Sequence, residues 1–310
     1  MQIDLQGILN SKRLAVSRAL SFVENSDELD LSLTEQLYKH LGSAYRIGVT
    51  GPPGAGKSTL VDLMIEKFRQ EGKRVAVISV DPTSPFTGGA ILGDRVRMGR
   101  HYSDRGVFIR SMATRGSRGG LALQTQEAAD IFDAAGYDVI IFETVGVGQV
   151  ELDVADAADT TLVILVPESG DDIQAMKAGL MEIADLFVMN KADRQGANQA
   201  FAQIKSMLET RSQVEQEWSP QVVKTSALQK DGLGTLLAGI ANHRTFLEAG
   251  EGLHQNLRRR LRSRIRKYIE KRVLSDYWDS EREQKFTSLS ELFLGNELGP
   301  VELVRELLKD

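Results

Sequence analysis

The sequence predicts a doubly wound α/β domain with a mostly parallel sheet and helical extensions at both ends of the chain. Three observations lead to this prediction. Short, often β-branched apolar runs alternate with stretches in which apolar residues recur at helical spacing. Most of these runs are apolar throughout, which is typical of strands that helices cover on both faces. Residues 1–42 and 251–310 contain no such run, and their apolar residues follow helical spacing.

We therefore divide the chain into three parts. Residues 1–42 form an N-terminal helical extension, residues 43–250 form the α/β domain, and residues 251–310 form a C-terminal helical extension. Strands are expected over residues 46–50, 74–80, 138–142, 160–166, 186–189 and 221–224. Helices are expected between them, over residues 60–69, 123–135, 173–183 and 197–208.

Composition excludes several classes of protein. The chain has 310 residues, 42% of them hydrophobic, and a formal net charge of −5, which argues against a nucleic-acid-binding protein. It has no cysteine, so disulfides and thiolate metal sites are excluded. No basic segment precedes an apolar run at the N-terminus, and no stretch approaches the roughly 20 apolar residues of a membrane-spanning helix. We expect a cytoplasmic protein with no membrane or nucleic-acid partner.

The first predicted strand runs into a glycine-rich segment that matches the phosphate-binding pattern Gly-x4-Gly-Lys-Ser. The segment consists of Gly51, Pro52, Pro53, Gly54, Ala55, Gly56, Lys57, Ser58 and Thr59. Glycines let successive backbone N–H groups face phosphate oxygens, and the helix that follows directs its N-terminus at the same charge. Lys57 is expected to reach the β- and γ-phosphates, and the Ser58 hydroxyl to bind Mg²⁺.

A second motif selects the base. Asn190-Lys191-Ala192-Asp193 follows a predicted strand with the spacing of guanine-recognition loops. The Asp193 carboxylate can accept hydrogen bonds from the ring N–H and the exocyclic amine of guanine, whereas adenine offers neither donor. Asn190 is expected at the far edge of the base and Lys191 along its face. After the last strand, Ser226, Ala227 and Leu228 fit a loop whose N–H groups read the guanine carbonyl. The motifs together predict a GTPase.

A third motif concerns the metal and hydrolysis. The strand over 138–142 runs into Glu143-Thr144-Val145-Gly146, where most GTPases carry Asp-x-x-Gly. At this place the acidic residue lies beside Mg²⁺, usually through water, and the glycine N–H contacts the γ-phosphate. We expect Glu143 and Lys57 to be the catalytic residues and Gly146 to bind nucleotide. Val147 replaces the glutamine that orients the attacking water in many GTPases, which predicts slow intrinsic hydrolysis completed by a partner or a rearrangement.

Two further aspartates are candidate metal ligands. Asp81 follows the strand over 74–80, at the sheet edge where α/β proteins bind ligands, and Asp94 lies in the segment beyond it. From the residues alone, Asp81 could equally form a turn before proline and Asp94 cap a helix. The basic, glycine-rich segment 110–120 is expected to be a mobile loop.

Four segments of the sequence closely resemble the MeaB/ArgK family of P-loop GTPases in the glutamate-switch class: residues 80–84, 93–98, 143–149 and 170–185. The resemblance extends from the N-terminal helices to about residue 250. It implies GTP/GDP and Mg²⁺ as ligands, with Ser58, Asp81, Asp94 and Glu143 around the metal. It also implies a homodimer that gates adenosylcobalamin loading and protects an adenosylcobalamin-dependent acyl-CoA mutase, typified by methylmalonyl-CoA mutase. Switch segments are implied at about 81–98, 143–151 and 167–177.

Two other functions remain open at this point. A metallochaperone GTPase for metal insertion would share the P-loop and the glutamate, but such proteins usually carry Cys or His clusters, which this sequence lacks. A kinase corresponds to the family's older arginine/ornithine transport label, and the guanine loop argues against ATP as its nucleotide.

A basic stretch, residues 258–272, contains nine Arg and Lys. Its apolar residues keep helical spacing, which favours a packing or dimer seam over nucleic-acid binding. The arginines are expected to be solvated or paired with downstream acidic residues, namely Asp276, Asp279, Glu281 and Glu283.

Overall fold

The computed structural model describes residues 3–25, 31–81, 99–113, 120–144, 150–169, 180–211, 218–295 and 297–309. The chain forms two compact units, Met1–Arg260 and Leu261–Asp310. The expected division of the chain at residues 42 and 250 stays a prediction. The boundary between the two compact units falls within the helix Gly252–Tyr277. No described helix is both long and apolar enough to cross a membrane.

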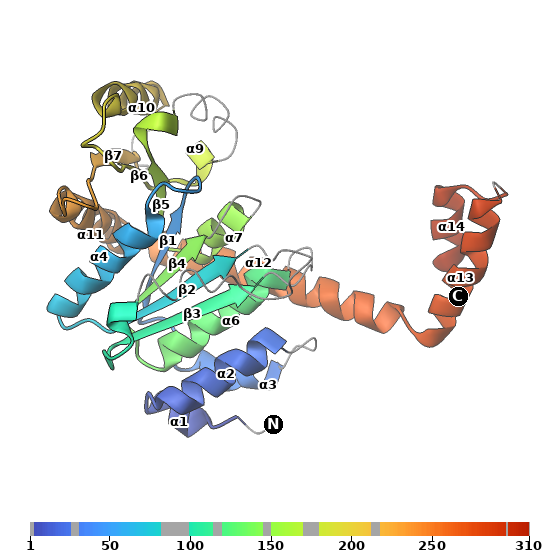
Figure 1. Ribbon diagram of the computed structural model, residues 1–310. Coiled ribbons are helices and arrows are strands. Elements are labelled where there is room, and N and C mark those ends of the chain that lie inside the picture. The colour runs from blue at the N-terminus through green and yellow to red at the C-terminus, as the bar shows by residue number, and fades with distance from the viewer. Residues whose placement is uncertain are drawn as a thin grey trace. The chain divides into compact units, whose positions relative to one another are not determined.

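The first unit contains a seven-stranded sheet with the order β3-β2-β4-β1-β5-β6-β7 (Figure 1). Every strand pairing is parallel, which confirms the predicted fold class. The strands are β1 (Tyr45–Thr50), β2 (Val75–Asp81), β3 (Val107–Ala113), β4 (Val139–Thr144), β5 (Thr160–Leu165), β6 (Leu186–Met189) and β7 (Gln221–Lys224). The six expected strands are all present, with ends displaced by at most two residues.

Strand β3 is not predicted from the sequence. It pairs only with β2, at the edge of the sheet, and carries Arg110 in its middle, so it lacks the apolar run of a central strand. The segment 110–120, expected to be a mobile loop, therefore begins inside a strand. Helix α2 (Arg13–Asn25) explains the arginine, because Glu24 forms an ion pair with Arg110. Arg13 of the same helix donates to the Val107 carbonyl at 3.0 Å.

Helices cover both faces of the sheet (Figure 1). The helices α4 (Lys57–Gln70) and α11 (Leu233–Ala249) pack on one face. The other face is covered by α6 (Gly120–Ala134), α7 (Val150–Ala157), α9 (Leu180–Ile183) and α10 (Ala197–Arg211). Helices α1 (Leu5–Leu9), α2 and α3 (Leu31–Tyr38) share one apolar cluster with α6. Of the helix expected over 173–183, the part before residue 180 lies outside the described residues.

The last three helices are α12 (Gly252–Tyr277), α13 (Ser280–Leu294) and α14 (Pro300–Leu307). Helix α12 starts in the first unit and continues into the second. Within the second unit, the Tyr277 hydroxyl donates to the Leu307 carbonyl at 2.7 Å. The rings of Trp278 and Phe286 meet edge to face, with centroids 5.9 Å apart. These contacts pack the three helices together.

Aspartates precede three of the central strands and close the sheet at its amino edge. Each carboxylate accepts a hydrogen bond from the backbone N–H of a residue that starts a neighbouring strand or lies beside its start. The bonds join Asp138 to Arg74 at 2.7 Å, Asp159 to Arg46 at 3.0 Å and Asp185 to Thr161 at 2.7 Å. These bonds give a partner to backbone N–H groups that would otherwise be unpaired at the start of a buried strand.

A buried polar cluster lies beside Asp185. Nδ1 of His243 is 2.7 Å from the Thr160 hydroxyl, and Nε2 is 3.4 Å from Asp185 Oδ1. The indole of Trp218 packs against the imidazole at 4.6 Å and donates to the Asp185 carbonyl at 2.8 Å. Burial raises the pKa of Asp185 to about 7 and lowers the pKa of His243 to about 4. At neutral pH the imidazole is therefore uncharged.

These two shifts have opposite effects on stability. A raised Asp185 pKa means that its stabilisation, full below pH 3.8, is lost as pH rises towards about 7. A lowered His243 pKa means that its stabilisation, full above pH 6.5, is lost as pH falls towards about 4. Between about pH 4 and 6.5, the two groups make opposite contributions to the slope of the free energy of unfolding against pH, and these contributions cancel.

We expect Asp185→Asn to reveal the contribution of His243 to the pH dependence of the free energy of unfolding. Its free energy of unfolding should rise with pH relative to the parent protein, by about 1 kcal/mol per pH unit over that window. The measurement is urea unfolding followed by Trp218 fluorescence in a Trp278→Phe background, because the chain has two tryptophans. Asp276→Asn, an exposed aspartate on α12, is the matched control and should keep the parental profile. Identical slopes for Asp185→Asn and the control would disprove the assignment.

Candidate functional site

The glycine-rich segment lies between the end of β1 at Thr50 and the start of α4 at Lys57. Gly51, Gly54 and Gly56 have φ values of 139°, 73° and 89°, which side chains rarely adopt. A Cβ on Gly51 would lie 2.2 Å from the Ile164 carbonyl oxygen, and one on Gly56 would lie 2.5 Å from the Asn190 amide nitrogen. The loop therefore needs glycine at these two positions both for its backbone angles and for its close contacts.

Lys57 is buried at the start of α4. Its ammonium group donates to the Gly51 carbonyl at 2.7 Å and to the Pro52 carbonyl at 3.0 Å. A positive charge is thus held against the loop's own backbone, beside the N-terminus of a 14-residue helix. Pro53 and Thr59, also predicted to bind nucleotide, are exposed, and Ala55 is buried.

Ser58 connects the loop to β4. Its hydroxyl donates to Oε1 of Glu143 at 2.5 Å, and Glu143 is 1% exposed. Glu143 reaches this position because β4 pairs with β1 and β2, opposite Val49 and Ser79. A hydroxyl and a carboxylate in contact at this edge are the hard oxygen ligands that Mg²⁺ prefers.

The other predicted metal and phosphate ligands are less fully described. Asp81 is the last residue of β2, one place beyond the residue opposite Thr144, so its backbone lies at the same edge. Its side chain lies outside the described part of the structure, as do Asp94 and Gly146. Their assignments stay predictions.

Asn190 joins the base loop to the phosphate loop. Its side-chain nitrogen donates to the Ala55 carbonyl at 2.8 Å. Its oxygen accepts from the Thr225 hydroxyl at 3.1 Å and from the Ala227 N–H at 3.3 Å. A buried amide with these three bonds positions the two loops relative to each other. The sequence predicts Asn190 at the base, but the residue pattern carries no direct signal for its bond to Ala55.

Asp193 is exposed beside the loop after β7. The Ser226 hydroxyl donates to Asp193 Oδ1 at 2.5 Å, and this bond is the main cause of a pKa below the usual value for aspartate. The carboxylate is therefore charged and oriented, as an acceptor for two N–H groups requires. Lys191 has a φ of 56°, and Leu228 is 85% exposed. These bonds bring Asp193 to Ser226 and Asn190 to Ala227, while the roles of all the predicted base-binding residues stay predictions.

A cluster of ion pairs fixes the outer side of α4. The carboxylate of Asp62 accepts from Arg100 at 2.9 Å and contacts Nε2 of His101 at 2.8 Å. Glu66, one turn further, lies 3.7 Å from Lys230 of the loop after β7. Arg100 and His101 form the short helix η1 (Gly99–His101). Two polar segments near the site are therefore attached to the helix that carries Ser58.

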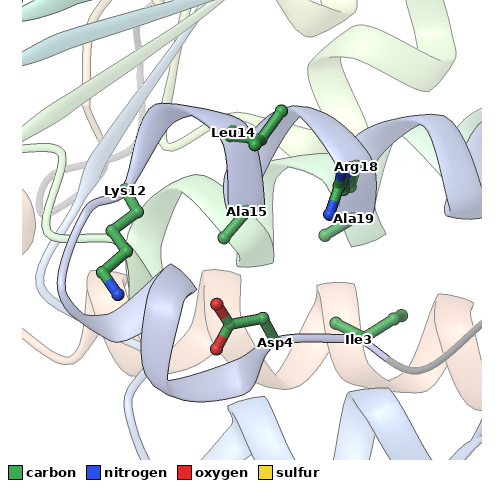
Figure 2. Close-up of a pocket in the computed structure, with 7 residues that line it drawn as sticks. All are labelled: Ile3, Asp4, Lys12, Leu14, Ala15, Arg18 and Ala19. Carbon is green, nitrogen blue, oxygen red and sulfur yellow. The ribbon is translucent and has the colours of Figure 1, made fainter.

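A small pocket lies elsewhere, on α1 and α2 (Figure 2). It is lined by Ile3, Asp4, Lys12, Leu14, Ala15, Arg18 and Ala19. Asp4 accepts a hydrogen bond from the Gly7 N–H at 2.8 Å, so its carboxylate caps α1. None of the predicted nucleotide-binding residues lines this pocket. The Asp4 carboxylate in it already has a structural role as the cap of α1.

Comparison with known proteins decides the family. A family model described as methylmalonyl Co-A mutase-associated GTPase MeaB matches residues 16–282. The chain belongs to the MeaB family. The resemblance seen in the sequence motifs is thereby confirmed, and the chain is a GTPase. Membership of this family also implies that it binds GTP and GDP.

Individual relatives agree with this assignment. The GTPase ArgK of Escherichia coli is 36% identical over 311 residues, which cover 98% of this chain and 94% of that protein. A protein of Pyrococcus abyssi is 52% identical over 251 residues, covering 80% and 78% of the two chains. The mouse methylmalonic aciduria type A homolog, a mitochondrial protein, is 34% identical over 244 residues, covering 73% and 59%.

Two solved structures are similar in fold. The crystal structure of an LAO/AO transport system kinase has a TM-score of 0.73 and 30% identity, and the alignment covers 98% of this chain and 94% of that one. HypB from Helicobacter pylori, solved in complex with nickel, has a TM-score of 0.50 and 17% identity, covering 70% and 95%. The second likeness concerns the fold alone.

We expect Asp193→Asn to change the base preference of this MeaB-family GTPase. An asparagine amide cannot accept from both guanine N–H groups, but it can donate to the carbonyl that xanthine has in place of the exocyclic amine. GDP affinity should fall by on the order of tenfold to a hundredfold, and xanthosine diphosphate should bind better than GDP. Titration calorimetry with both nucleotides measures this. Glu209→Gln, an exposed change on α10, should bind as the wild type does. Unchanged GDP affinity in Asp193→Asn would remove Asp193 from the base site.

Proposed function

We propose that this GTPase is a chaperone that gates adenosylcobalamin loading onto a cobalamin-dependent acyl-CoA mutase and protects that mutase. The observation that carries the proposal is the family match, because the description of the family names methylmalonyl-CoA mutase as the associated enzyme. The name of the mouse relative, which refers to methylmalonic aciduria, points to the same metabolite. A mutase of the methylmalonyl-CoA type is therefore the client.

GTP or GDP binds across the carboxyl edge of the sheet in this proposal. Gly51 to Thr59 and Gly146 contact the phosphates, with Lys57 neutralising their charge. Asn190, Lys191 and Asp193 hold the base, together with the backbone of residues 226–228. The bond between Asn190 and the Ala55 carbonyl supports this arrangement, because it places the base loop next to the phosphate loop.

Mg²⁺ is the proposed metal, with Ser58, Asp81, Asp94 and Glu143 as its ligands or as acceptors from its water molecules. The contact between the Ser58 hydroxyl and Glu143 supports this assignment, since both groups are oxygen donors at the phosphate end of α4. When bound, the ion supplies charge neutralisation for the transferred phosphoryl group. Glu143 then orients a water molecule, and Lys57 stabilises charge that develops on the phosphate.

The protein is proposed to form a homodimer through its C-terminal extension, residues 251–310. Large apolar side chains are exposed along its helices, among them Leu261, Ile265, Ile269, Leu274, Trp278, Phe293, Leu294, Val301, Val304 and Leu308. Exposed apolar surface of this kind is usually covered by another chain. Two arginines of the basic stretch have i,i+4 partners, Arg266 with Glu270 and Arg272 with Asp276.

A kinase is the second candidate function. It is favoured by one observation, the name of the LAO/AO transport system kinase whose structure is similar over most of the chain. Release of all the γ-phosphate to water, with none found on arginine or ornithine, would exclude it. The metallochaperone alternative has no comparable support, because the likeness to HypB concerns the fold alone.

The proposal predicts nucleotide-dependent binding to the client. Purified protein with Mg²⁺ and either GDP or a non-hydrolysable GTP analogue is passed over immobilised methylmalonyl-CoA mutase. We expect the retained amounts to correspond to affinities that differ by about tenfold. The reason is that a switch can report its nucleotide only if the partner binds its two states unequally.

Two lysine variants on α4 make the control. Lys57→Ala should abolish the difference, because Lys57 lies against the phosphate loop. Lys67→Ala, an exposed change on the same helix, should preserve it. The proposed function would be refuted if the wild-type protein were retained equally with both nucleotides, or if it were not retained at all.

A further inference from the structure

Helix α12 is attached to the first unit by a buried ion pair at the amino edge of the sheet. Arg260, the last residue of that unit, donates to Asp159, and the two side chains are 11% and 4% exposed. Burial lowers the pKa of the Arg260 guanidinium, while the Asp159 charge acts in the opposite direction. Because removing both charges from water is costly, the pair adds little net stability, whereas either charge without its partner would be strongly unfavourable.

Asp159 holds β1 with its second oxygen. Oδ2 accepts from the Arg46 N–H at 3.0 Å, and the Asp159 N–H donates to the Arg46 carbonyl at 2.8 Å. The Arg46 guanidinium in turn donates to Asp130 of α6 at 2.8 Å. One carboxylate therefore connects α12 directly to the strand that leads into the phosphate loop.

Helix α7 also ends at this carboxylate. It finishes at Ala157, two residues before Asp159, and lies directly on β1 at Gly48. A Cβ on Gly48 would lie 2.9 Å from Val154 Cγ1 and 3.1 Å from the Ala158 Cβ. Such close packing leaves no slack between helix and strand, so a displacement of either one moves Asp159.

The opposite ends of these elements lie at the nucleotide-binding edge. Strand β1 leads into Gly51 and the phosphate loop, and α7 follows β4, which carries Glu143 near its end. The hydroxyls of Thr50 and Thr144, at the ends of the two strands, lie 3.3 Å apart. Asp159 is thus connected through short, packed elements to both segments that contact phosphate and metal in the proposed site.

We propose that the Asp159–Arg260 ion pair transmits the nucleotide state of the core to α12, which is the output helix of the switch. Asp159 and Arg260 are positioning residues, since neither lies at the nucleotide edge. This inference rests on the proposed function, because only a partner-coupled switch needs an output. Its basis in the structure is that Arg260 joins α12, which continues as one helix into the second unit, to a carboxylate held by β1 and α7.

Hydrogen exchange of the full-length protein tests the proposal. Exchange rates of amides in residues 261–277 are compared with Mg²⁺ and either GDP or a non-hydrolysable GTP analogue. The wild type should show a difference of about fivefold between the two nucleotides. Arg260→Met, which keeps an unbranched side chain but removes its charge, should abolish the difference. Arg260→Lys should restore part of it.

Arg266→Met is the matched control, because Arg266 lies on the same helix and is 81% exposed. It should keep the wild-type difference, and all variants should bind GDP with similar affinity. Should Arg260→Met fail to fold, Asp159→Asn gives the same test, since its amide oxygen still accepts from the Arg46 N–H. A wild type without any difference, or an Arg260→Met that keeps it, would overturn the proposal. If Arg260→Met loses the difference but the wild type does not bind the mutase, the proposed client is refuted and the role of the ion pair still stands.

Discussion

Every strand pairing in the sheet is parallel. This constraint sets the positions of the candidate nucleotide site and of the buried aspartates that bond to the starts of the strands. Segments that follow the strands gather at the carboxyl edge, and those that precede them gather at the amino edge. The phosphate loop and Asn190 follow strands and Glu143 lies near the end of one, so residues far apart in the sequence meet at one edge. Asp138, Asp159 and Asp185 all precede strands and lie at the other.

The two edges differ in their polar chemistry. At the carboxyl edge, Asn190 bonds to the phosphate loop and Ser58 bonds to Glu143 of β4, and glycines shape the backbone there. At the amino edge, buried aspartates bond to the starts of neighbouring strands, and Asp159 also holds an arginine of α12. The first edge is built to accept an anionic ligand. At the second edge, α12, the helix that continues into the other unit, is attached to the sheet.

Much of this architecture could be predicted from local patterns. Buried strands and the phosphate loop depend on neighbouring residues, so apolar runs and motif spacing reveal them. Strand β3 is not predicted because Arg110 interrupts its apolar run, and the ion pair with Glu24 of α2 compensates that charge. The bond of Asn190 to Ala55 and that of Arg260 to Asp159 join residues distant in sequence, so no local pattern predicts them. An aspartate directly before each of three strands is a signal that could have been read.

The proposed coupling between GTP hydrolysis and a mutase partner is tested most directly by the single-turnover rate of GTP hydrolysis with and without methylmalonyl-CoA mutase. The protein alone should hydrolyse GTP slowly, because Val147 stands where many GTPases carry the glutamine that orients water. Saturating mutase should raise the rate by at least about tenfold, as a partner does when it completes a catalytic site. Fast hydrolysis by the isolated protein that the mutase leaves unchanged would contradict this account.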